Sequence, residues 1–198
     1  MNHLISLTGL RNRYFGIRHG QAESNTLHIV IGDPRVGVKA YGLTSIGKQQ
    51  VRYSIPQCLD LDDSCLIYSS DFLRAKETAE ITGELIGVDQ IFLEAALRER
   101  FFGRFEGTSS AAYDFVHAAE NPEFYSENGV ESLESVLDRT TRLVKRLEED
   151  HSGRKIILVS HGDPLFCLEA GFRKAYPIHN NGYFIMGNAE IKEFKLVQ

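Results

Sequence analysis

Short apolar runs alternate along the chain with longer stretches in which apolar residues recur at helical spacing. The run KIILVS at 155–160 is continuously apolar, as expected of a parallel strand that is covered on both faces. Taken together, the apolar runs predict strands over residues 12–18, 65–70, 91–97, 155–160, 183–186 and 190–196.

Helices are predicted between these strands, and their ends carry recognisable signals. Thr44 and Ser45 offer an N-cap for a helix that Pro56 closes, and Gly87 is typical of a helix end. The helices are predicted over 45–55, 72–86, 109–118 and 130–150, with another after Gly162. The stretch 21–41, rich in glycine, is predicted to be a long loop. Because strands alternate with helices, we expect an α/β fold, a three-layer α/β/α sandwich with a mostly parallel central sheet.

Composition narrows the class of protein. The 198 residues include 22 Lys and Arg against 27 Asp and Glu, and 42% are hydrophobic, which suits one domain over 1–198 with a sizeable core. The net charge of −5 argues against nucleic-acid binding, and no apolar run approaches the roughly 20 residues that a membrane span needs. The three cysteines form no CxxC motif, so we expect free thiols and a cytoplasmic location.

Two predicted strands end in the same pair of residues. Arg18-His19-Gly20 follows the first strand and Ser160-His161-Gly162 follows the strand at 155–160. A single histidine at a strand end is usually a polar turn residue. Because ligands bind beyond the carboxyl ends of strands in open α/β sheets, two such histidines are instead expected to meet over one site.

Arg74 and Glu99 are predicted to lie at the same edge of the sheet. Arg74 falls on the first turn of a helix, where it is either a solvated surface residue or a bidentate clamp on an anion. Glu99 is either a loop carboxylate paired with Arg98 or Arg100, or the acid that protonates a leaving oxygen. Arginines, two histidines and a carboxylate in one crevice indicate phosphoryl transfer through a histidine.

The chain resembles the histidine phosphatase superfamily, the phosphoglycerate mutase-like proteins. The resemblance covers residues 14–187 and is carried in order by IRHGQAESN (17–25), GLTSIGKQQ (42–50), YSSDFLRAKETAEI (68–81), ALRERFFGRFEG (96–107), GVESLESVLDR (129–139) and LVSHGDP (158–164). It departs from the usual pattern at Gln21, Ala22 and Asp163. No counterpart is assigned to the N-terminal extension, residues 1–11.

The resemblance implies a phosphoglycerate mutase-like fold and a phosphoric monoester hydrolase of the histidine acid phosphatase type. It implies a phosphohistidine intermediate, no metal, no cofactor and a small phosphorylated metabolite as the substrate. The catalytic residues would be His19, attacking through Nε2, and Glu99. The phosphate-binding residues would be Arg18, Asn25, Arg74 and His161, with His161 carrying a positive charge.

Three alternatives are weighed against this function. A metal-dependent phosphoesterase needs ligand-spaced histidines, and the sequence has no HxH, HxxxH or HxxEH element. A mutase shares the phosphohistidine, but glycolytic mutases carry a longer insertion between the acid and the second histidine. A non-catalytic phosphate-binding module would not need to keep every catalytic residue type.

A basic stripe on the predicted long helix has a simpler interpretation. Arg139, Arg142 and Arg146 share one face, and neighbouring acids make this a solvated, self-compensating face. The physiological substrate and the oligomeric state are not specified by the sequence.

Overall fold

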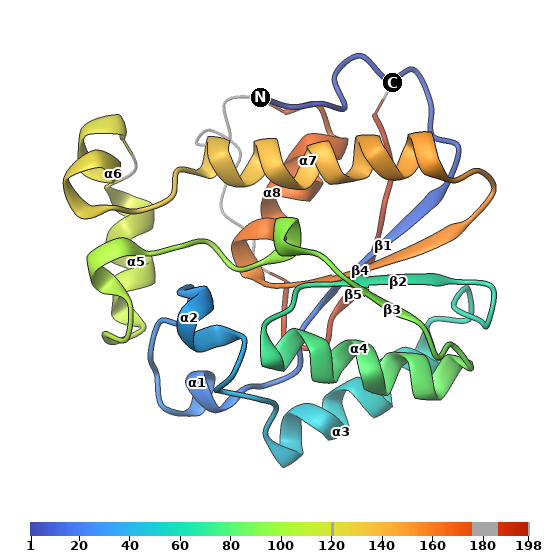
Figure 1. Cartoon of the computed structure of the whole chain (residues 1–198), viewed down its shortest axis with the longest axis horizontal. Helices are drawn as coiled ribbons and strands as arrows, with labels where there is room; N and C mark the ends of the chain where they lie inside the picture. Colours follow the sequence, from blue (N-terminus) through green and yellow to red (C-terminus); the bar gives the residue numbers. More distant parts are fainter. Residues whose placement is uncertain (120, 176–185, 198) are drawn as a thin grey trace.

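A mostly parallel sheet forms the centre of the described part of the chain, which comprises residues 1–119, 121–175 and 186–197 of the computed structural model. Within these residues the sheet has the strand order β3-β2-β4-β1-β5 (Figure 1). Strands β1 to β4 pair in parallel, and β5 pairs antiparallel with β1. The strands are β1 (Arg13–Arg18), β2 (Leu66–Ser69), β3 (Ile91–Leu93), β4 (Lys155–Ser160) and β5 (Ile191–Phe194).

Helices cover both faces of the sheet, as predicted. Helices α3 (Ser45–Ser54) and α4 (Leu73–Ile86) lie on one side, and α7 (Leu133–Asp150) and α8 (Gly162–Phe172) lie on the other (Figure 1). Alternate residues of β4 enter two different core clusters, since Ile156 and Leu158 pack with α7 and α8, and Ile157 and Val159 pack with α3 and α4. The three-layer α/β/α architecture is therefore confirmed.

The helix ends follow the predicted local chemistry. The Thr44 hydroxyl accepts a hydrogen bond from the Gly47 N–H and so caps the start of α3. Helix α4 ends at Gly87, whose φ of +79° lies in the left-handed region. A short 3-10 turn, η1 (Ile55–Gln57), follows α3 at the position of Pro56.

One predicted strand is shorter than expected. The strand predicted over 91–97 ends at Leu93 and continues as the 3-10 turn η2 (Ala95–Leu97). Strand β3 lies at the edge of the sheet beside β2, and the last β2 residue that pairs with it, Ser69, stands opposite Leu93. Strand β2 ends at Ser69, whose carbonyl oxygen still accepts from the Glu94 N–H at 2.7 Å, and the chain then turns inward to bury Leu97 completely.

Short helices occur in the predicted loop 21–41 and also after the helix predicted over 109–118, where the sequence predicts none. The predicted loop 21–41 contains α1 (Glu23–Thr26) and α2 (Pro34–Gly37). Past the 3-10 turn η3 (Gly103–Phe105), α5 (Ala111–Ala118) is joined by α6 (Pro122–Asn128), and these two helices lie at one end of the sandwich (Figure 1). The long helix predicted from residue 130 begins at Leu133, because Ser132 is its N-cap.

The N-terminal extension packs on the helical layer that α7 and α8 form. Leu4 is fully buried, and the Asn2 side chain donates a hydrogen bond to the Gly171 carbonyl oxygen at 3.0 Å. The His3 N–H donates to the Thr141 hydroxyl at 3.2 Å. These contacts make residues 1–11 part of the folded structure, and the extension runs along α7 (Figure 1).

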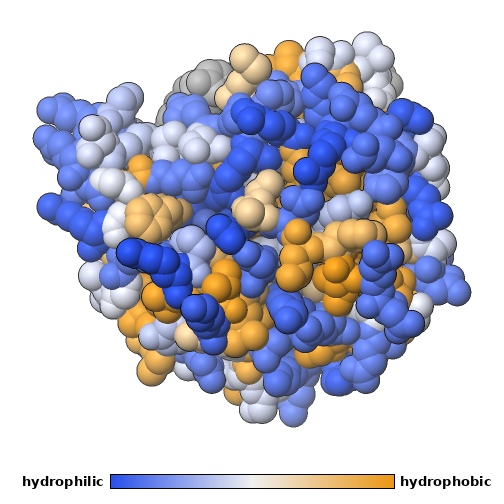
Figure 2. Space-filling view, in the orientation of Figure 1, coloured by the Kyte–Doolittle hydropathy of each residue, from blue (hydrophilic) through white to orange (hydrophobic). Residues whose placement is uncertain are grey.

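The last features of the fold are the surface, the cysteines and the C-terminal strands. Apolar side chains form separate patches on the face shown in Figure 2, with no continuous apolar surface. All three cysteines are free thiols, as predicted. No helix among the described residues has the length and apolar character to cross a membrane. Of the predicted strand 183–186, positions 183–185 lie outside the described residues.

Candidate active site

The parallel register of β1 and β4 brings the two predicted histidines together. Arg18 stands opposite Ser160, so His19 and His161 leave the sheet at the same edge, and the His19 N–H donates to the Ser160 carbonyl oxygen at 3.0 Å. The two imidazole rings lie 5.1 Å apart between centroids, and both side chains are buried. The predicted meeting of the histidines over one site is confirmed.

His19 has a defined tautomer. Its Nδ1 lies 2.7 Å from the Gly20 carbonyl oxygen, which can only accept, so Nδ1 carries the proton. Its Nε2 accepts a hydrogen bond from Nε of Arg74 at 3.1 Å. Burial, with the charges of Arg74 and Arg18, holds the pKa of His19 well below its usual range. His19 is therefore a neutral imidazole with its lone pair on Nε2, as a histidine nucleophile requires.

Arg74 is buried at the start of α4 and uses only part of its guanidinium. Besides the bond to His19, Nη2 donates to the Ile31 carbonyl oxygen at 2.9 Å, and the guanidinium carbon lies 5.1 Å from the centre of the Phe72 ring. Nη1 is buried and has no hydrogen-bond partner among the described residues. Leaving such a donor unpaired costs about 1–3 kcal/mol, so this position is well suited to a bound anion.

Arg18 and His161, like Arg74, each have one buried nitrogen without a hydrogen-bond partner among the described residues. Arg18 donates through Nη1 to the Met186 carbonyl oxygen at 2.5 Å, and its buried Nε has no partner in the described chain. His161 contacts the Ser70 hydroxyl through Nε2 at 2.9 Å, and its Nδ1 is likewise buried without a partner there. Three unpaired nitrogens thus come from three of the four predicted phosphate-binding residues.

The expected positive charge on His161 is wrong for this structure. Burial first, and then the charge of Arg74, hold the pKa of His161 well below its usual range, so the ring is neutral. The Ser70 hydroxyl accepts from the Phe72 N–H at 3.2 Å, and it can give its own proton to Nε2 of His161. In that arrangement the Nδ1 of His161 carries the ring proton. Sequence reasoning missed Ser70, although it stands in the matched segment at 68–81.

Glu99 is buried close to these groups. Its Oε1 accepts a hydrogen bond from the Arg100 N–H at 2.9 Å, and 7% of the residue surface is exposed. Burial, followed by the negative charge of Asp163, raises the pKa of Glu99 to about 7 against the opposing effect of Arg74. A carboxyl group with this pKa holds and releases a proton near neutral pH, as a general acid must.

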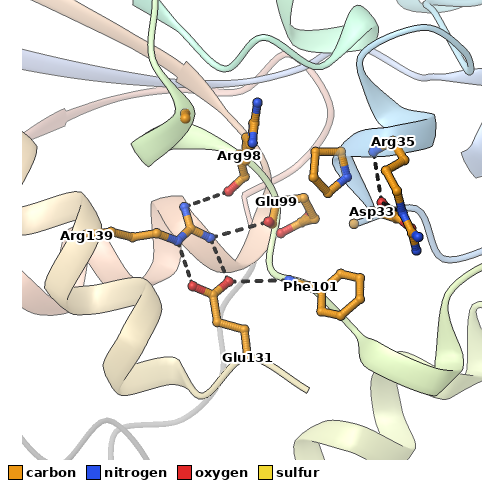
Figure 3. Close-up of a pocket in the computed structure, with 10 residues that line it drawn as sticks. Asp33, Arg35, Arg98, Glu99, Phe101, Glu131 and Arg139 are labelled. Carbon is orange, nitrogen blue, oxygen red and sulfur yellow. Dashed lines mark hydrogen bonds and ion pairs between the residues drawn. The ribbon is translucent and has the colours of Figure 1, made fainter. Parts of the chain in front are cut away.

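Arg139 anchors the Glu99 segment and corrects the interpretation of the basic stripe. Its guanidinium donates to the carbonyl oxygens of Arg98 and Glu99 at 2.8 and 3.3 Å and pairs with Glu131 (Figure 3). It also donates to the Ala96 carbonyl oxygen at 2.7 Å. The other two members of the stripe do lie at the surface, where Arg142 pairs with Asp138 and Arg146 with Glu94. Helical spacing shows that the three arginines share a face. It does not show that backbone carbonyl oxygens of another segment lie within hydrogen-bond reach of Arg139.

Glu106, unlike Glu99, binds backbone N–H groups of two segments. Its carboxylate accepts backbone N–H bonds from Gly32 at 2.7 Å, Asp33 at 3.0 Å and Phe102 at 2.7 Å. A Cβ atom at Gly32 would lie 2.0 Å from the Arg100 carbonyl oxygen, so only glycine allows this close approach. Glu106 therefore joins the segment after Ile31 to the turn around Phe102.

Asn25 lies within the predicted loop and makes a local contact. Its Oδ1 accepts a hydrogen bond from the Ala22 N–H at 2.9 Å at the start of α1. No hydrogen bond links it to the other five predicted residues in the described part of the chain. Its predicted contact with phosphate stays a prediction.

Helix α5 adds a residue that the sequence did not indicate. The Tyr113 ring packs against Phe102 at 4.9 Å between centroids, and burial together with the charge of Glu99 raises the pKa of its phenol. Arg74 and Asp163 also act on that phenol. The apolar pattern predicts the helix but gives no signal that Tyr113 faces the site.

A pocket of about 540 Å³ adjoins the Glu99 segment (Figure 3). Its arginines are already engaged, since Arg35 pairs with Asp33 and Arg139 with Glu131. Arg98, a third arginine of the lining, pairs with Asp71 through two hydrogen bonds of 2.8 and 2.6 Å. Among the described residues, no group of three or more His, Cys, Asp or Glu side chains is arranged to hold a metal ion.

Comparison with known proteins agrees with this geometry. Over 187 residues, the chain is 28% identical to phosphoglycerate mutase-like protein 4 of Arabidopsis thaliana, covering 91% of this chain and 77% of that protein. It is 27% identical over 164 residues to a metal-independent phosphoserine phosphatase of the same plant, covering 77% and 65%. Among solved structures, a mycobacterial glucosyl-3-phosphoglycerate phosphatase in complex with VO3 superposes with a TM-score of 0.73 at 27% identity, covering 91% of both chains. The profile of the histidine phosphatase superfamily (branch 1) matches residues 15–197, and the chain belongs to that family.

Proposed function

We propose that the protein is a phosphomonoesterase, a phosphoric monoester hydrolase of the histidine acid phosphatase type, that works through a phosphohistidine on a small phosphorylated metabolite. The observation that carries the proposal is a set of unpaired buried nitrogens on three residues that lie close to His19. Nε of Arg18, Nη1 of Arg74 and Nδ1 of His161 have no partner in the described chain. A phosphate group supplies the acceptor oxygens that these donors lack.

The first step transfers the phosphoryl group to the protein. Nε2 of His19 attacks phosphorus, the N–P bond forms, and the bond from phosphorus to the alcohol oxygen breaks. Glu99 gives its proton to that oxygen, so the alcohol leaves in neutral form. Arg18, Arg74 and His161 hold the non-bridging phosphate oxygens and stabilise the charge that develops on them.

The second step returns the protein to its resting state. Glu99, now a carboxylate, takes a proton from a water molecule as the water oxygen attacks phosphorus. The N–P bond breaks, inorganic phosphate leaves, and His19 is again neutral. Because the pKa of Glu99 is about 7, the same carboxyl group can serve as acid and then as base at neutral pH.

The relatives support hydrolysis of a small phosphate ester. Two of them are named phosphatases, one for phosphoserine and one for glucosyl-3-phosphoglycerate. The complex of the second with VO3, an analogue of phosphate, fits a pocket built for phosphoryl groups. Phosphoglycerate mutase-type transfer is the second candidate, because another relative is named phosphoglycerate mutase-like.

A phosphoenzyme trapping experiment tests the proposal. After brief mixing with a labelled phosphate ester, we expect an acid-labile, base-stable phosphoprotein that His19→Ala no longer forms. His151→Ala is the matched control, since His151 bonds the Tyr68 hydroxyl away from the site. Normal labelling and activity in His19→Ala would exclude the mechanism. Activity should also survive exhaustive chelation, and assays of phosphatase and mutase activity side by side distinguish the two candidates.

A further inference from the structure

Asp163 is a buried carboxylate next to the candidate active site that no step above uses. It is the second residue of α8, two positions after His161, and 2% of its surface is exposed. Its Oδ2 lies 3.4 Å from Nη1 of Arg100 and 3.4 Å from Nε2 of His117. Asp163 thereby joins α8 to the segment that carries Glu99 and to helix α5.

Arg100 connects the two buried carboxylates. Its backbone N–H holds Oε1 of Glu99 at 2.9 Å, and its side chain reaches Asp163 and, through Nε, the Glu131 carbonyl oxygen at 2.6 Å. Glu99 accepts a neutral backbone donor, whereas Asp163 faces a guanidinium. Asp163 is the carboxylate beside the guanidinium, and in a water-poor region its negative charge opposes ionisation of Glu99.

We propose that Asp163 is a positioning residue for the acid step, which keeps a proton on Glu99 at neutral pH and holds the Glu99 segment through Arg100. The proposal rests on the function proposed above, in which Glu99 protonates the leaving oxygen. After burial, the charge of Asp163 is the largest factor that raises the pKa of Glu99 to about 7.

Other charged groups near Glu99 also affect its pKa. Arg74 on α4 and Arg18 on β1 oppose the effect of Asp163, because their positive charges favour the ionised form of Glu99. Within the described part of the chain, further titratable or charged side chains come from Tyr113 and His117 on α5, Arg139 on α7, and His161 before α8. Replacing Asp163 leaves all of these in place, so its effect on Glu99 can be measured separately.

The test compares Asp163→Asn and Asp163→Ser with the wild-type chain. In each variant the alkaline limb of the single-turnover rate for an alkyl phosphate should move about one pH unit lower, because a nearby negative charge has been removed. The carboxyl carbon of Glu99, labelled with carbon-13 and assigned with Glu99→Gln, should titrate at a lower pH by the same amount. Asp71→Asn is the matched control, since Asp71 pairs with Arg98 outside this cluster, and its limb should not move.

The outcomes separate this proposal from the proposed function. If both titrations of the Asp163 variants coincide with those of the wild type, Asp163 does not act on Glu99. The proposal is also wrong if neither variant folds by circular dichroism, since Asp163 is then needed only for stability. If the Glu99 carbon titration shifts but no phosphohistidine forms in the wild-type chain, the coupling holds and the proposed mechanism fails.

Discussion

Nε of Arg74 donates its hydrogen to Nε2 of His19 over 3.1 Å, so the lone pair proposed to attack phosphorus is bound to a guanidinium in the resting protein. A phosphate ester that reaches Nε2 has to take the place of this N–H. In the proposed mechanism, Arg74 gives its donors to the phosphate oxygens, where Nη1 gains the partner that it lacks among the described residues. The arrangement keeps His19 unprotonated before the substrate arrives.

Arg74→Lys tests this relationship. Lysine keeps a positive charge but not the planar set of donors, so it cannot hold Nε2 of His19 and the phosphate oxygens in one geometry. We expect the single-turnover rate to fall by about 10²–10³-fold and vanadate inhibition to weaken. Arg52→Lys, at an exposed pair with Glu84, is the control. Equal rates in the two lysine variants would show that charge alone suffices at Arg74.

Glu99→Gln separates the acid role from phosphate binding. Glutamine keeps the shape of the side chain but delivers no proton, so alkyl phosphates, whose leaving oxygen needs protonation, should lose about 10²–10⁴-fold in the first step. An aryl phosphate with a good leaving group should lose far less. Burst amplitudes and rates have to be measured apart from the steady state, because hydrolysis of the phosphoenzyme also uses Glu99. Equal losses for both esters in the burst phase would remove Glu99 from the acid role.

The pH dependence of the first step follows from the lowered pKa of His19 and the raised pKa of Glu99. The pKa of His19 lies well below 6.5, so the nucleophile stays neutral in mildly acidic solution. The acid limb of the burst rate should therefore be centred at a pH below 6.5. The pKa of Glu99 is about 7, so the rate for alkyl phosphates should decline above that pH. Aryl phosphates should lack the alkaline limb. An acid limb centred at or above pH 6.5 would contradict the neutral, buried His19.

Glu99 should also make the stability of the fold depend on pH. Its folded pKa of about 7 exceeds the ordinary value of 4.5, so the folded chain binds more protons than the unfolded chain between these values, and stability falls as pH rises through them. Glutamine does not ionise, so Glu99→Gln does not lose stability in this way. Relative to the wild type, its free energy of unfolding should rise by up to about 3 kcal/mol above pH 7, and this gain should vanish below pH 4.5. Thermal unfolding of both proteins from pH 4 to 8 measures the difference, with exposed Glu84→Gln as the control. A difference that does not vary with pH would contradict the raised pKa.

Asn25→Asp tests the remaining predicted phosphate contact. The substitution keeps the oxygen that accepts from the Ala22 N–H, so thermal stability should change little. It replaces the amide donor with a negative charge, so vanadate should bind at least about tenfold more weakly if the amide contacts phosphate. Unchanged vanadate binding would leave Asn25 as a cap of α1 alone.

Local patterns in the sequence are enough to predict the layers of the fold and the place of the site. Short apolar runs and the helical spacing of apolar residues predict the order of strands and helices, and cap residues such as Thr44 and Gly87 mark helix ends, because these signals depend on neighbours along the chain. The pairs His19-Gly20 and His161-Gly162 were expected to meet, since parallel strands deliver their carboxyl ends to one edge of a sheet.

Contacts between distant segments are decided only by the packed structure. The neutral state of His161 depends on burial beside Arg74, and no local pattern reports the depth of a side chain or the charges around it. Arg139 was assigned to a solvated face, because helical spacing does not reveal that the carbonyl oxygens of 96, 98 and 99 lie within its reach. In the sequence, Asp163 is one of three departures from the family pattern. Its link to Glu99 through Arg100 appears only once α8 packs against the turn that carries the acid, since electrostatic coupling follows distance and burial rather than position in the chain.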